Sequence, residues 1–240
     1  MNYPAVIKAS SLIELGDIVG AEYELANLLE TDGESALVLA LDQLQPKDLL
    51  AVVREYDSSK MSVINMVITP PQFANAVVLE RLYGDKTHEQ LRSLINSVVF
   101  RDDVDSGAFL EALGDKEGGS DTLADYLMDR FEQICLFAIH GTYNIHDVAK
   151  LKSEEIEELM DSGELDANPA SASRDDYMDR DWMEMTWLLS HEHEDLFREV
   201  LSLLAARRQK WLINGGDEDE ASAASLVGRV AVGDEEESAL

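Results

Sequence analysis

Short segments with helical periodicity, separated by glycine or proline, follow one another through the first 100 residues. Apolar side chains recur at every third or fourth position in each segment, and none shows strand alternation with turn signals. The short connections between segments favour an array of helical hairpins, so we predict an all-α chain. The helices predicted in this region span residues 12–30, 35–44, 47–56, 60–68, 72–83 and 88–100.

Capping sequences and a proline motif mark where these helices begin. Ser11 and Thr87 each precede a Glu or Gln by three residues, which is the capping-box signature of a helix start. Similar amphipathic stretches begin at Pro46 and Pro71, 25 residues apart. Over about residues 35–83, the spacing of these proline-started amphipathic helices resembles that in the helical superhelix at the N-terminus of bacterial magnesium channels. The resemblance implies a helical array. It does not extend to membership in that family, because the membrane and nucleotide-sensing parts of the family have no counterpart in this sequence.

The region from 101 to 172 has less regular patterning than the first 100 residues. The strongest helical pattern in it ends at Gly141, a residue type that commonly follows a helix C-terminus. The predicted helices are Ala108–Leu113, Asp121–His140, 144–151 and 153–160, with a flexible loop at 114–119 and a linker at 163–172.

A long amphipathic helix is the clearest element that the sequence predicts. Ser173 is a suitable N-cap for a helix from Arg174 to Ile213, and Asn214-Gly215-Gly216 would end it. Acidic residues gather near its start and basic residues near its end, as the helix dipole favours. The polar stretch Ser190–Asp195 allows a break within it.

The chain is strongly acidic, with 49 Asp and Glu against 19 Lys and Arg and a net charge of −30. Residues 1–100 contribute −7, residues 101–214 contribute −16 and residues 215–240 contribute −7. This charge opposes direct binding to nucleic acid or to an anionic membrane, because both are polyanions. It favours a basic or amphipathic protein partner, while solubility and salt adaptation remain alternative reasons for the acidity.

The last 26 residues are predicted as a flexible acidic tail, because two acidic blocks flank a short apolar island. Leu226, Val227 and Val230 in this island are candidate partner-binding residues, since such a segment suits a sheet edge or a groove. The predicted organisation is a helical array at 1–100, a helical middle region with a linker at 101–172, a long helix at 173–214 and a tail at 215–240.

No catalytic or cofactor-binding motif is present in the sequence. Phosphate-binding glycine loops, the nucleophile-elbow motif and an EF-hand loop are all missing, and Cys135 is predicted to be a core residue. His191 and Asp195 would share one helix face and could hold one metal together, whereas His193 lies on the apolar stripe. We expect no cofactor and no physiological metal, because a metal site needs three or four converging ligands.

All three tryptophans fall on the predicted long helix. Trp182 and Trp211 lie near its apolar stripe, and Trp187 lies off it, which indicates a second packing face or an exposed hot spot. We therefore name Trp182, Trp187 and Trp211 as candidate partner-binding residues, and an oligomer formed through this helix is compatible with the pattern.

Three classes of function fit the sequence. The first is a non-catalytic interaction protein, such as an assembly chaperone, an adaptor or a structural subunit of the kind that serves phage head or tail assembly. The second is a DNA mimic that inhibits a nuclease or another DNA-binding protein with carboxylates in place of phosphates. The third is an enzyme with a carboxylate-based site. No segment is apolar enough to predict a spanning helix or a signal peptide, so we expect a soluble protein of the cytoplasm, or of the host cytoplasm if it is viral.

Overall fold

The computed structural model describes residues 3–55, 62–83, 88–101, 104–143 and 181–213. Every regular element in these ranges is a helix, which confirms the all-α class. The chain divides into two compact units, Met1–Leu201 and Ser202–Leu240. The helices are α1 (Pro4–Glu14), α2 (Ile18–Asp32), α3 (Glu34–Leu41), α4 (Pro46–Glu55), α5 (Val63–Val67), α6 (Pro70–Tyr83), α7 (Glu89–Val99), α8 (Ser106–Gly114), α9 (Gly119–Leu127), the 3₁₀ turn η1 (Met128–Arg130), α10 (Phe131–His140), α12 (Trp182–Glu192) and α13 (Glu194–Ile213).

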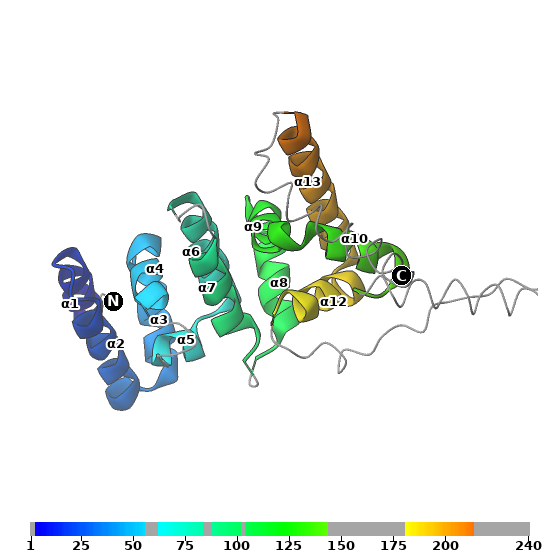
Figure 1. Ribbon diagram of the computed structural model, residues 1–240. Coiled ribbons are helices and arrows are strands. Elements are labelled where there is room, and N and C mark those ends of the chain that lie inside the picture. The colour runs from blue at the N-terminus through cyan, green and yellow to red at the C-terminus, as the bar shows by residue number, and fades with distance from the viewer. Residues whose placement is uncertain (1–2, 56–61, 84–87, 102–103, 144–180, 214–240) are drawn as a thin grey trace, which may run out of the picture. The chain divides into compact units, whose positions relative to one another are not determined.

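The first helices of the first unit form a two-layered array. Helices α2, α4, α6 and α8 pack against one another in succession, and helices α1, α3, α5 and α7 form the second layer in the same way. Figure 1 shows this progression from α1 to α9. The array predicted for residues 1–100 therefore continues into α8 and α9, which both pack against α6.

Amphipathic helices supply the apolar core between the two layers. Leu49, Val52 and Val53 of α4 are almost fully buried, and so is Phe73 of α6, whose ring meets the edge of Phe109 of α8 with ring centroids 5.3 Å apart. Burial of such side chains provides the main driving force for stacking one helix pair on the next. No helix within the described ranges has the length and apolarity that crossing a bilayer requires.

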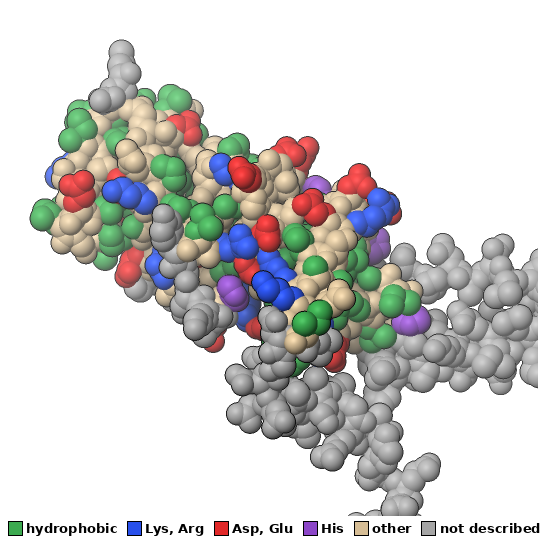
Figure 2. Space-filling view, turned by 90° about the horizontal axis from the view of Figure 1, so that it is seen from above, with side chains coloured by type: hydrophobic (Ala, Val, Ile, Leu, Met, Phe, Trp, Pro, Cys, Tyr) green, Lys and Arg blue, Asp and Glu red, His purple; other side chains and the backbone are tan. Residues whose placement is uncertain are grey.

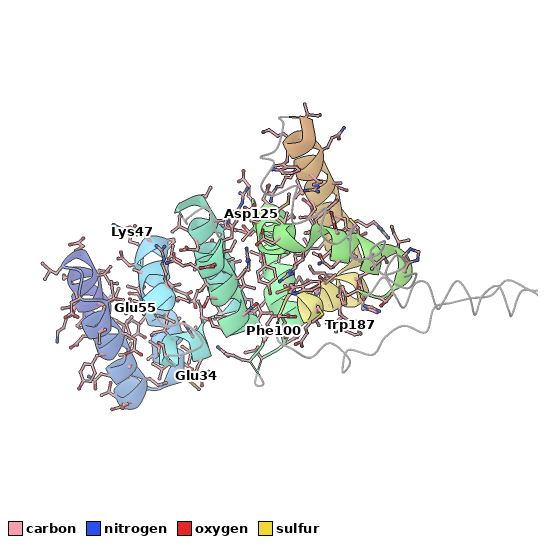
Figure 3. The ribbon with its side chains drawn as sticks, viewed as in Figure 1. Glu34, Lys47, Glu55, Phe100, Asp125 and Trp187 are labelled. Carbon is pink, nitrogen blue, oxygen red and sulfur yellow. The ribbon has the colours of Figure 1, made fainter. Side chains whose placement is uncertain are left out.

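Arginine side chains join different elements of the array. Each of three arginines pairs with a carboxylate on another helix or turn, so these three positive charges are used within the protein. Asp125, on α9, lies toward α6 in this arrangement (Figure 3). The pairs are Arg54–Glu80 between α4 and α6, Arg81–Asp121 and Arg81–Asp125 between α6 and α9, and Arg92–Asp129 between α7 and η1.

The helix predicted at 12–30 is wrong at its start, because a hairpin of α1 and α2 replaces it. Ser11 lies inside α1, where its hydroxyl donates to the Ile7 carbonyl oxygen at 2.9 Å instead of capping a helix. The chain turns at Gly16, which has a φ of 82°, and Asp17 is the residue that caps α2, by accepting from the Gly20 amide at 2.8 Å. The predictions at 47–56 and 72–83 are confirmed as α4 and α6.

The single helix predicted at Asp121–His140 is also wrong, because η1 interrupts it and separates α9 from α10. The predicted loop at 114–119 is a tight turn, in which Gly118 adopts a φ of 83° and Gly119 already begins α9. A β-carbon on Gly119 would lie only 1.7 Å from the Leu113 carbonyl oxygen. The glycines therefore permit a close contact between α8 and α9.

The long C-terminal helix is divided, so the prediction of one continuous element is corrected. Its described part consists of α12 and α13, which are separated at His193, inside the stretch where the polar sequence allowed a break. Residues 173–180, the helices predicted at 144–151 and 153–160, the linker at 163–172 and the tail at 215–240 lie outside the described residues.

Candidate functional site

An acidic groove of about 440 Å³ lies between the end of α8 and the junction of α12 with α13. Two short stretches that are far apart in the sequence form its walls, and both belong to the first unit. The lining residues, which define the acidic groove below, are Glu111, Gly114 and Asp115 on one side and Glu192, His193, Glu194, Asp195, Leu196 and Glu199 on the other.

The helix break at His193 creates one wall of the acidic groove. His193 has φ −135° and ψ 54°, which is not helical, yet its amide still donates to the Leu189 carbonyl at 3.1 Å. Its own carbonyl accepts from the Phe197 amide at 2.9 Å and so begins α13. His193 thus ends one helix and starts the next, which redirects the acidic residues that follow it.

Two glycines of α8 allow this junction to approach closely. A β-carbon on Gly114 would lie 3.0 Å from a methyl group of Leu196, and one on Gly107 would lie 3.4 Å from Nε2 of His193. That Nε2 atom is buried and has no hydrogen-bond partner among the described residues. The imidazole therefore fills space at the base of the junction.

The acidic groove carries six exposed carboxylates, and its lining residues include no Lys or Arg within the described chain. Arg198 does not line the groove, but its guanidinium pairs with Glu194 and with Asp195 on the same helix. Asp195 and Glu199 on α13 are four residues apart and share a helix face, while Glu111 lies on α8 and Asp115 is the residue that follows its end. The groove therefore presents a surplus of negative charge from two sides.

The metal arrangement considered for His191 and Asp195 is not present in the structure. The break at His193 lies between them, so they do not share the face of one continuous helix. The His191 ring stacks on Trp187 at 4.2 Å, and Asp195 pairs with Arg198. Among the described residues, no group of three or more His, Cys, Asp or Glu side chains has an arrangement that could hold a metal ion.

Two of the three candidate tryptophans lie on α12, and each has an aromatic neighbour. Trp182 is half-buried, lies against Tyr143 with ring centroids 5.0 Å apart, and is covered by the Arg130 guanidinium at 5.5 Å. Trp187, labelled on α12 in Figure 3, is also half-buried. The aromatic packing leaves neither side chain as a fully exposed hot spot.

The remaining candidate partner-binding residues lie at or beyond the end of α13. Trp211 is half-buried and stacks with the Arg208 guanidinium at 4.6 Å, one turn earlier on the same helix. Leu226, Val227 and Val230 lie outside the described residues. The role of all these residues in partner binding stays a prediction.

Cys135 is half-buried on α10, where the sequence predicted a core position. Burial, and secondarily the Glu132 carboxylate, raises the pKa of the Cys135 thiol above its ordinary value of 9.0. The thiolate is the nucleophilic form of cysteine, so a raised pKa works against a nucleophilic role at neutral pH.

Carboxylates on the face shown in Figure 2 lie in small groups, with basic and apolar side chains between them. A protein that mimics DNA is expected to carry long rows of acidic side chains, placed like the phosphates of the two DNA strands. Residues 147–199, which hold 17 of the 49 acidic residues and are the best candidate in the sequence for such rows, fall largely outside the described residues.

The acidic groove was not predicted from the sequence. The spacing of Glu111 with Asp115 and of Asp195 with Glu199 was visible as pairs four residues apart. Exposed pairs of this kind are common on solvated helices, and only the break at His193 brings the two pairs to one groove.

Comparisons with known proteins identify no relative of this chain. The chain matches no protein-family model, no curated protein and no solved structure.

Proposed function

We propose that this protein is a non-catalytic adaptor or assembly chaperone that holds a basic segment of a protein partner in the acidic groove. The observation that carries this proposal is the convergence of six exposed carboxylates, from the end of α8 and from the junction of α12 with α13, on one groove without a lining Lys or Arg in the described chain. The helical array gives the groove a rigid base. The single cysteine and the acidic composition suit work in the cytoplasm.

Charge complementarity supports a basic partner. The arginines of the array are already engaged between helices, so they do not neutralise the groove. Arginine or lysine side chains of a partner would find several carboxylates within reach, and such complementarity favours fast association and the right partner. Leu196 adds an apolar surface for the stem of a long basic side chain.

A DNA-mimic inhibitor is the second candidate, because a charge of −30 on 240 residues would suit competition with DNA for a basic cleft. The two functions differ in what duplex DNA does. A partner bound through a DNA-binding cleft is released by duplex DNA, whereas a partner held by a basic tail in the acidic groove stays bound.

The test is affinity capture with the tagged full-length protein from its native cell, followed by mass spectrometry, using a groove variant beside the wild type. The groove variant is Glu192→Gln with Glu199→Gln, which removes two charges from opposite ends of one wall. We expect a basic protein in the wild-type capture and about tenfold less of it with the groove variant, because interfacial charge pairs contribute on the order of 1–2 kcal/mol.

The matched control is Glu30→Gln with Glu34→Gln, which removes the same charge from exposed positions on α2 and α3. This control variant should capture as much partner as the wild type. Equal capture by the groove variant and the control would refute the acidic groove as the binding site, and release by duplex DNA would favour the mimic.

A further inference from the structure

Exposed apolar side chains are concentrated on the first helix pair of the array. Nine large apolar residues are exposed among the described residues, and four of them lie between residues 7 and 23. The other five are spread over the remaining described chain. The four, which we call the terminal apolar surface, are Ile7 (60% exposed), Leu15 (82%), Val19 (60%) and Tyr23 (68%).

The position of α1 and α2 at the end of the array explains why this surface has no cover. Inside the array, α4 packs against α2 on one side and α6 on the other, so its apolar residues are buried from both sides. The main packing of the α1–α2 pair is toward α3, α4 and α5, and no described helix follows it on the outer side (Figure 1). Stacked helical repeats usually end in a pair with a polar outer face, and this pair departs from that rule.

The terminal apolar surface follows both helices of the pair. On α2, Val19 and Tyr23 are one helical turn apart and therefore lie on the same side. The ion pair of Lys8 with Glu24, at 2.6 Å, aligns the first half of α1 with the middle of α2, so Ile7 and Tyr23 lie at similar heights along the pair. Leu15 stands at the turn between the helices, near the first turn of α2 that carries Val19.

We propose that the α1–α2 pair is a self-association surface, which binds the same pair of a second copy of this chain. Packing of one helix pair on another is how the array covers every inner pair, and a second copy brings a pair of equal length with the same exposed apolar residues. A contact of one surface with itself is closed by a two-fold axis and stops at a dimer.

The area of the terminal apolar surface is enough for a weak dimer. The exposed parts of its four side chains amount to roughly 500 Å² per chain, so a two-fold contact would bury about 1,000 Å², near the lower limit for a specific interface. We therefore expect a dissociation constant on the order of 10–100 µM.

The effect of salt on binding distinguishes this proposal from the proposed function. Two copies that each carry −30 repel one another, so added salt screens the repulsion and strengthens the dimer. Binding of a basic segment in the acidic groove is weakened by the same salt. The failure of one proposal therefore leaves the other open.

The experiment is sedimentation equilibrium of the full chain from about 5 to about 500 µM, in roughly 50 and 500 mM NaCl. The expected result is a weight-average mass that rises from the monomer toward twice that value with concentration, and at lower concentration in the higher salt. A mass that stays at the monomer value throughout would overturn the proposal, as would a dimer that dissociates on addition of salt.

Matched leucine variants locate the surface. Leu15→Glu places a charge on the terminal apolar surface, and Leu82→Glu places the same charge on α6, at a leucine that is 64% exposed. Both positions are exposed, so both variants should fold, which far-UV circular dichroism would confirm. We expect Leu15→Glu and Tyr23→Glu each to raise the dissociation constant at least tenfold, and Leu82→Glu to leave it within twofold. A dimer that resists Leu15→Glu and Tyr23→Glu would place the interface elsewhere and overturn the proposal.

Discussion

Arg54 on α4 and Glu80 on α6 form an ion pair, with 3.5 Å between Nε and Oε2, in which the carboxylate is almost completely buried. The same guanidinium donates to the side-chain oxygen of Gln90 at the start of α7. One arginine therefore connects three helices of the array.

We expect Arg54→Met to lower the free energy of unfolding by about 2 kcal/mol, because it removes the ion pair of a buried carboxylate while keeping the apolar stem. Urea unfolding followed by circular dichroism measures this change. Lys47→Met on the same helix is the control, since that lysine is exposed and its loss should cost less than about 0.5 kcal/mol. Equal losses for the two variants would show that the Arg54–Glu80 pair contributes little.

Gly119→Ala should be strongly destabilising, by about 3 kcal/mol or more, because the added carbon would overlap the Leu113 carbonyl oxygen, which is backbone and cannot rotate away. Gly141→Ala provides the comparison. Gly141 has a φ of 70° but no atom within 4 Å of an added β-carbon, so only the left-handed backbone is penalised, by about 1 kcal/mol. A Gly119→Ala protein as stable as Gly141→Ala would contradict the close packing of α8 against α9.

The all-α class and helices such as α4 could be predicted from the sequence because period and proline position are local properties. The hairpin of α1 and α2 could not, since Ser11 satisfies the capping box and yet bonds back to Ile7 within a helix. Whether a serine caps or bonds back depends on where the chain turns, and that turn at Gly16 is stabilised by the packing of α1 on α2.

The acidic groove needed information that no single segment contains. The sequence allowed a break at Ser190–Asp195 but did not show that α8 would approach it. The approach depends on Gly107 and Gly114, whose missing side chains leave room for His193 and Leu196. Glycines in helices reduce helix propensity when read alone, so their packing role becomes visible only with the partner in place.

Trp182→Ala should destabilise the protein by about 2 kcal/mol, because the indole packs on Tyr143 and lies under the Arg130 guanidinium. Ile139→Ala, at a position on α10 that is 73% exposed, should change stability by less than about 0.5 kcal/mol. Both effects are measured by urea unfolding. A loss of partner binding in Trp182→Ala would therefore be interpreted only beside its measured stability. If the stability of Trp182→Ala equals that of the wild type, the indole does not hold the fold together and Trp182 stays a candidate partner-binding residue.

The buried phenol of Tyr126 makes the stability of the protein depend on pH in the alkaline range. Its hydroxyl donates to the Asn96 side-chain oxygen at 2.6 Å between α9 and α7. Burial, and secondarily the Asp181 carboxylate, raises the pKa of the Tyr126 phenol well above its ordinary value of 10.0. Below pH 10 the phenol is neutral in both the folded and the unfolded chain, so its contribution to stability is fully present. Above pH 10 it ionises first in the unfolded chain, and this contribution is lost as the pH rises.

We therefore expect Tyr126→Phe to cost about 1 kcal/mol at neutral pH, through the lost hydrogen bond, and to lose less stability than the wild type above pH 10. Between pH 10 and pH 11 the stability of the wild type relative to Tyr126→Phe should fall by about 1 kcal/mol, so that the variant becomes the more stable protein. Urea unfolding at each pH measures it, with Tyr23→Phe, at an exposed tyrosine, as the control that should run parallel to the wild type. If Tyr126→Phe also runs parallel to the wild type up to pH 11, then the phenol is not held neutral by burial between α7 and α9.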